Sequence, residues 1–207
     1  MSAFRLGGWA AGSFAAIGAA YVVTLGFAVA RFGLDEPIGD PQLAIMEVLT
    51  LLSAPALLIV MAAVHEYASA DRRIFGVVAL AFTVVFTGIT STVHFVELTA
   101  SRQLGAGGIV WPSHAYAAEL LAWDWFLGIA LLFAAPVFSG TGSEAAVRRG
   151  LWISGGLALA GTMGPLLGDM RLQRIGILGY ACVLPIVFYM LARLFFRILP
   201  TAPRPSQ

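Results

Sequence analysis

The chain contains six long apolar runs, and they constrain its fold more than any other feature. A helix needs about 20 apolar residues to cross a hydrocarbon core of about 30 Å. Runs of that length occupy residues 9–31, 42–65, 74–100, 114–138, 148–168 and 174–198. We therefore expect an all-α integral membrane protein, folded as a compact bundle of six transmembrane helices.

The composition agrees with this class and excludes several functions. Of the 207 residues, 59% are hydrophobic and 11% charged, whereas a soluble domain has about 25% charged residues. The net charge of +1 leaves no basic surface for nucleic acid. The chain has no lysine, which excludes a lysine Schiff base, and its single cysteine, Cys182, excludes an internal disulfide or a cysteine-rich metal site.

The runs predict one domain over residues 1–199, followed by a Pro-rich tail at 200–207 that we expect to be disordered. The first run exceeds the apolar region of a signal peptide, about 7–15 residues, so we expect it to be retained. Eight arginines fall on the side of the N-terminus and four on the other side. This asymmetry predicts that both termini are cytoplasmic, and with the short loops it favours a bacterial inner (plasma) membrane.

Glycines indicate where helices can approach one another closely. Gly8 and Gly12 form a small-residue pair on the first span, and Gly161, Gly164 and Gly168 follow one face of the fifth. Small residues at such spacings are typical of helix contacts in membranes. We expect both sets to lie at packing seams.

Polar residues recur along one face of the third run. At spacings of three and four lie Thr83, Thr87, Thr90, His94, Glu97 and Ser101. A polar stripe in an apolar span must face protein or water. The threonines can bond carbonyls of their own helix, so we interpret them first as packing residues. His94 and Glu97 lie on adjacent turns, where the carboxylate can orient the imidazole, and we interpret this pair as functional.

Further acids lie on the neighbouring spans. Antiparallel packing brings Glu47 on the second span and Glu119 on the fourth to a depth similar to that of His94. Asp124 lies ten residues into the fourth span, about 15 Å along its axis and near the midplane. A carboxylate at that depth must be protonated, paired or beside a polar pocket. Its other interpretation is a buried hydrogen bond that fixes the packing of the helices.

These positions define the candidate site. The predicted catalytic residues are Asp124, Glu97, His94 and Glu119, and the predicted substrate-binding residues are Trp123, Trp125, Tyr116, Glu47 and Thr90. Tyr116, Glu119 and Trp123 share a helical face at spacings of three and four. Aromatic faces in such a pocket could stabilise a developing cation. The resulting expectation is a blind, outward-facing polar pocket.

We predict no cofactor and no resident metal. His65 and His94 lie toward opposite sides of the membrane, so they cannot ligate one haem iron. His94 and Glu97, with Glu119 or Glu47, form a conceivable metal set. An HxxE pattern on one helix is too common to predict a metal by itself.

Acid–base chemistry on a lipid-soluble substrate fits this residue set best. Carboxylates in a low-dielectric pocket can donate or accept protons, so the sequence predicts a membrane enzyme that isomerises or cyclises an isoprenoid or sterol-like molecule. Its general arrangement is similar to that of small integral-membrane sterol isomerases and terpene cyclases, which also place acids and aromatics among few helices. The similarity is one of arrangement and carries no residue across.

Two other functions stay open at this stage. A small transporter or proton-coupled carrier would use the stripe as a pathway, although the polar residues thin out toward the cytoplasm. A non-catalytic subunit or assembly factor of a membrane complex would use the stripe to dock a helix. The expected partners are membrane lipids, a hydrophobic small molecule and, if the chain forms a homo-oligomer, a second copy.

Overall fold

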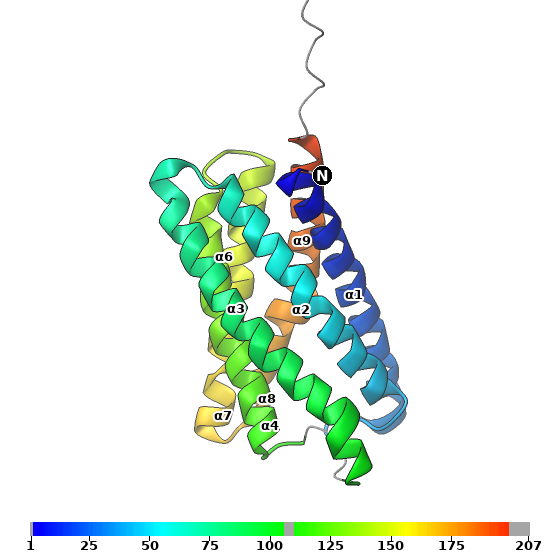
Figure 1. Ribbon diagram of the computed structural model, residues 1–207. Helices are drawn as coiled ribbons and strands as arrows, with labels where there is room; N and C mark the ends of the chain where they lie inside the picture. The colour runs from blue at the N-terminus through cyan, green and yellow to red at the C-terminus, as the bar shows by residue number, and fades with distance from the viewer. Residues whose placement is uncertain (1, 106–109, 199–207) are drawn as a thin grey trace, which may run out of the picture.

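The computed structural model describes residues 2–105 and 110–198, and within these ranges every regular element is a helix (Figure 1). The tail at 200–207, predicted to be disordered, lies outside the described residues.

Six helical stretches of the described chain are long and apolar enough to cross a membrane, as predicted. They are Ala3–Phe32, Gln42–Tyr67, Ala70–Ser101, His114–Val137, Ser143–Leu167 and Met170–Arg197. The first two are single helices, α1 and α2. The other four are composed of η1 (Ala70–Arg72), α3 (Arg73–Val96) and η2 (Glu97–Ser101); α4 (His114–Leu120), η3 (Leu121–Leu127), α5 (Gly128–Ala134) and η4 (Ala135–Val137); α6 (Ser143–Gly161) and α7 (Met163–Leu167); α8 (Met170–Ile177), η5 (Leu178–Val183) and α9 (Leu184–Arg197).

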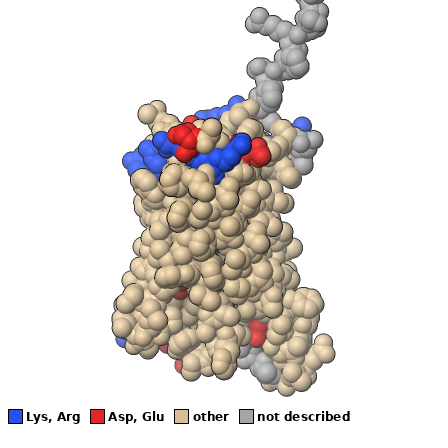
Figure 2. Space-filling model, turned by 60° about the vertical axis from the view of Figure 1, so that its left-hand side comes forward, with Lys and Arg blue, Asp and Glu red and all other residues tan. Residues whose placement is uncertain are grey.

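The outer surface of the bundle is suited to lipid. Large apolar side chains such as Phe27, Phe95 and Ile186 are more than half exposed, a poor match to water but a good match to acyl chains. Figure 2 shows charged side chains gathered at the ends of one face, with a broad uncharged band between them. These features are those of a multi-pass membrane protein. Helix α1 begins and α9 ends at the same end of the bundle (Figure 1), and the cytoplasmic location of that end stays a prediction.

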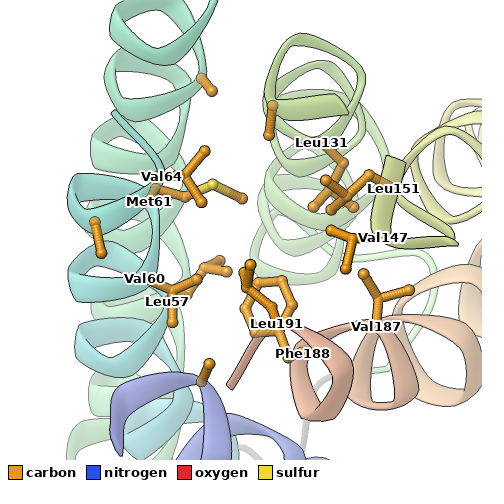
Figure 3. Close-up of a cluster of buried hydrophobic side chains, with 14 of the residues drawn as sticks. Leu57, Val60, Met61, Val64, Leu131, Val147, Leu151, Val187, Phe188 and Leu191 are labelled. Carbon is orange, nitrogen blue, oxygen red and sulfur yellow. The ribbon is translucent and has the colours of Figure 1, made fainter. Parts of the chain in front are cut away.

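Apolar packing closes the half of the bundle that carries the termini. Here α1 packs along α2 and α9, and α6 packs against α5. Leu57 and Met61 of α2, Leu131 of α5, and Phe188 and Leu191 of α9 are fully buried and point toward one another (Figure 3). The other half is different, because there α1 and α2 diverge from α4 and α8 around a cavity.

The glycine seams follow the prediction in part. A Cβ on Gly161 would lie 2.8 Å from the Cα of Gly176, so α6 and α8 cross at these two residues. On α1, a Cβ on Gly8 would lie 3.0 Å from the ring of Phe196, whereas Gly12 has nothing within 4 Å. The expectation for Gly12 was therefore wrong, because the face of α1 that meets α9 is set by the crossing angle and not by spacing alone.

Replacing Gly176 with Ala should destabilise the bundle. The added Cβ would overlap the carboxylate of Asp124 and would lie 3.3 Å from the Cα of Gly161. Overpacking of this kind costs about 1–3 kcal/mol, so we expect a lower Tm in detergent. Gly12→Ala is the matched control, because its Cβ meets nothing and alanine favours a helix. Equal melting temperatures for the two variants would contradict this account of the crossing.

Candidate functional site

A cavity of about 1390 Å³ lies at the end of the bundle that carries the connection between α1 and α2. Its walls come from α1, α2, α3, η2, α4, η3, α8 and η5. On α2 the lining reaches Ser53, and one turn further Leu57 is fully buried in the apolar core. On α1 it reaches Phe14, whose ring packs 4.7 Å from that of Phe188. The cavity is therefore blind, with its mouth at one end of the bundle.

Three hydrogen-bond donors converge on one carboxylate oxygen in the wall of this cavity. Oε1 of Glu119 on α4 accepts from Oγ1 of Thr90 at 2.7 Å, and it lies 2.8 Å from Nε2 of His94. Both partners come from α3, and Nε1 of Trp123 on η3 is the third donor. Thr90, His94 and Glu119 are all buried. The group thus ties α3 to α4 and η3.

The three donors determine where the hydrogens lie. An indole N–H can only donate, so Oε1 of Glu119 is an acceptor, and Nε2 of His94 must carry a hydrogen to bond to it. Nδ1 of His94 is buried and has no partner among the described residues. The bond to Glu119 therefore fixes the orientation of the His94 ring, with a hydrogen on Nε2.

Two other predicted acids also line the cavity. Glu97, at the start of η2, is 7% exposed, and its carboxylate accepts one bond in the described structure, from the hydroxyl of Ser101 at 3.1 Å. Glu47 on α2 is 2% exposed and lies 2.9 Å from Nη2 of Arg102. Glu47 is thus neutralised by an arginine, whereas Glu97 has no ion pair with a described residue.

Asp124 lies apart from this group. It is fully buried on η3, outside the cavity lining, and its Oδ1 packs against Gly161 and Gly176. Nε2 of Gln173 lies 3.4 Å from Oδ2 of Asp124 and 2.9 Å from the hydroxyl of Tyr180. The structure therefore places Asp124 behind the wall, where it contacts a residue that does line the cavity.

The predicted binding residues divide in the same way. Tyr116 and Trp123 line the cavity together with Glu47. Thr90 lies behind Glu119 and reaches the cavity only through its hydrogen bond. Trp125 is 47% exposed on the outside of the bundle and does not line the cavity.

Among the cavity residues that were not predicted from the sequence are Tyr21, Gln173 and Tyr180. Gln173 and Tyr180 are seven residues apart, so they share a helical face, and this spacing was the signal that could have found them. The arginines that flank Gln173 give its segment the composition of a loop. Tyr21 lies alone in an apolar run and offers no such signal.

Widened helical turns lie at three places around the cavity. The π-helical segments are η2, η3 and η5, which carry Glu97, Trp123 and Tyr180, respectively. A π-helical turn rotates the following residues relative to a regular α-helix, and such turns are frequent at functional sites. In the last span Pro185, which has no N–H, is the second residue after η5.

Two arginines hold the α1–α2 connection at the mouth of the cavity. Arg102 pairs with Asp40 in the connection as well as with Glu47, and Arg174 of α8 lies 2.5 Å from the carboxylate of Asp35. The hydrogen bond from Arg102 holds the pKa of Asp40 below its ordinary value of 3.8, and that from Arg174 does the same for Asp35. The mouth is therefore bordered by paired charges.

The conceivable metal set is not gathered at one point. Among the described residues, no three side chains of His, Cys, Asp or Glu converge in the way that a bound metal ion needs. The bonds of His94 and Glu119 instead join them to each other and to uncharged donors.

Comparison of the chain with models of known families, with curated proteins and with solved structures finds no match. Any assignment of function therefore depends on the chemistry of the cavity itself.

Replacing Arg102 with Gln should loosen the mouth. The change frees the connection at residues 33–41 and leaves buried Glu47 without its cation, so we expect a lower Tm and faster amide hydrogen exchange in that segment. Arg171→Gln is the matched control, because Arg171 is exposed at the same mouth and its side chain has no ion pair with a described residue. Equal exchange in both variants would contradict the proposed clamp.

The same connection should be insensitive to mild acid. The ion pairs of Asp35 and Asp40 contribute above the ordinary pKa of 3.8 and are lost only as the pH falls through their lowered values. Between about pH 8 and about pH 5, exchange in this segment should stay constant once corrected for its intrinsic pH dependence. A rise within that range would show that another group controls the mouth.

Proposed function

We propose that this chain is a membrane-embedded enzyme that moves a proton on a lipid-soluble substrate held in the cavity, in an isomerisation or cyclisation. The observation that carries the proposal is the bonding of Glu119, which fixes the orientation of His94 in the wall of a blind cavity. A histidine oriented by a carboxylate is an arrangement that suits general-base catalysis.

The proposed step is a proton shift. In this step the ring of His94 first turns its buried Nδ1 toward the cavity. Nδ1 then accepts a proton from a substrate carbon beside a double bond, the electron pair of the broken C–H bond forms a new double bond, and the old one opens toward a second carbon. The imidazolium then returns the proton to that second carbon. Atoms and electrons balance without an oxidant or a reductant, and His94 ends in its starting state.

Glu119 stabilises the charged intermediate in this scheme. While His94 carries the extra proton, the carboxylate lies 2.8 Å from its Nε2 and balances the positive charge. Thr90 and Trp123 hold the carboxylate in place, so little reorganisation is needed when the charge forms. Glu97, which lines the same cavity, is available as a second proton donor or acceptor.

The proposal assigns Asp124 a positioning role in place of the catalytic role that its depth suggested. Asp124 touches the glycine crossing and Gln173 but not the cavity. Gln173 in turn bonds the hydroxyl of Tyr180, which faces the cavity. Asp124 thus shapes one wall through Gln173.

The closed half of the bundle supports an enzyme over a carrier. Below the cavity lie fully buried apolar side chains from α2, α5 and α9 (Figure 3). A polar solute would need a path through this core, and none of the ionisable side chains discussed above continues into it. A substrate that enters and leaves by the same mouth fits this shape better.

Hydrogen exchange into substrate tests the proposal without knowledge of the substrate. Membranes containing the protein would be incubated in D₂O with a mixture of isoprenoids and sterols, and the lipids would be analysed by mass spectrometry. We expect wild-type protein to introduce deuterium into one class of compound, because the shuttled proton exchanges with solvent. His94→Gln should reduce this rate by about 100-fold or more, the usual contribution of a general base.

His114→Gln provides the matched control, since His114 is exposed at the start of α4 and does not line the cavity. This variant should retain the wild-type rate. Deuterium uptake that is equal in the His94 and His114 variants would remove His94 from the chemistry. No uptake with wild-type protein across the mixture would count against proton transfer on these compounds.

A further inference from the structure

The cavity is lined by more negatively charged than positively charged side chains. In the described structure its lining holds seven carboxylates and three arginines: Asp35, Glu36, Asp40, Glu47, Glu97, Glu119 and Asp169, against Arg102, Arg171 and Arg174. All three arginines lie at the mouth, next to η2 or in the first turns of α8. Arg102 and Arg174 are already paired with aspartates there. The excess negative charge therefore lies inside.

The inner carboxylates are Glu97 and Glu119. Glu97 is five residues before Arg102 on the same span, about 7.5 Å deeper, and is more than nine-tenths buried with one hydroxyl as its donor. Glu119 bonds neutral donors through Oε1, and its Oε2 is buried without a partner among the described residues. Glu97 is therefore the carboxylate that a ligand in the cavity can contact, and Glu119 lies behind the surface of the same wall. A carboxylate in a low-dielectric wall, without an ion pair to a described residue, attracts positive charge.

Aromatic rings make up much of the wall beside these acids. Tyr116 lies one turn before Glu119, and the ring of Trp123 packs 4.9 Å from that of Tyr180. Tyr21 faces them from α1 across the cavity. Aromatic faces bind organic ammonium groups through cation–π attraction, whereas a small hydrated metal ion gains little from them.

We infer that the cavity recognises an organic cation, a lipid-soluble molecule that carries a protonated amine or quaternary ammonium group between Glu97 and the aromatic rings. The inference rests on the proposed function, because it assigns the substrate class of the same cavity. The apolar remainder of the molecule would occupy the deeper lining, toward Phe14.

A pair of isosteric probes tests this inference. Phenyltrimethylammonium and tert-butylbenzene have the same shape and differ by one positive charge. Binding of each would be measured by calorimetry or tryptophan fluorescence on the full chain in phosphatidylcholine nanodiscs, with empty nanodiscs subtracted. We expect the cation to bind at least about tenfold more tightly than the neutral probe, the effect of one favourable charged contact.

Two variants locate the binding. Glu97→Gln keeps the acceptor for Ser101 but removes the charge, and it should weaken binding of the cation by about tenfold and leave the neutral probe unchanged. Tyr116→Leu, which removes a ring and no charge, should weaken binding of the cation by a few fold. Glu66→Gln removes the same charge at the exposed, opposite end of α2, and it should leave the affinity for both probes unchanged.

The outcomes also separate this inference from the proposed function. Equal affinity for the two probes, or equal loss in the Glu97 and Glu66 variants, would overturn it even if deuterium exchange were observed. Selective binding of the cation that depends on Glu97 would sustain it even if His94→Gln left deuterium exchange unchanged.

Discussion

A single buried oxygen atom, Oε1 of Glu119, determines the arrangement of this site. A carboxylate is tolerated inside an apolar bundle only where donors surround it, and here a threonine, a histidine and a tryptophan do so. The same bonds fix the separation of α3 from α4 and η3, hold the imidazole in one orientation and place both groups in a cavity wall. Where no such group is present, apolar side chains close the bundle (Figure 3).

The rest of the polar residues support this centre at different distances from it. Arg102 neutralises Glu47 and holds the α1–α2 connection at the mouth, whereas Asp124 lies behind the wall and contacts Gln173. The cavity is therefore polar and aromatic on the side of Glu119 and apolar at its floor. Such a shape suits an amphiphilic molecule that enters from one end of the bundle.

Much of this could be predicted from the sequence, because hydropathy and helical spacing are local properties. The six spans were correct within a few residues, and counting residues along antiparallel spans placed His94 and Glu119 at one depth. The directions in which individual side chains point were harder to predict. Trp123 and Trp125 are two residues apart and lie on opposite faces of the helix, so only Trp123 lines the cavity. The glycines that enclose Asp124 depend on a crossing that no local pattern records.

The most direct test of this account is the state of the His94 ring, measured by ¹⁵N NMR on protein labelled at histidine. Each histidine signal can be assigned, because the chain has three histidines and each can be replaced in turn. The account predicts a neutral ring with the hydrogen on Nε2 and a pyridine-like Nδ1, and it predicts that Glu119→Ala abolishes this preference. A hydrogen on Nδ1 in the wild-type protein would contradict the bonding on which the proposed chemistry depends.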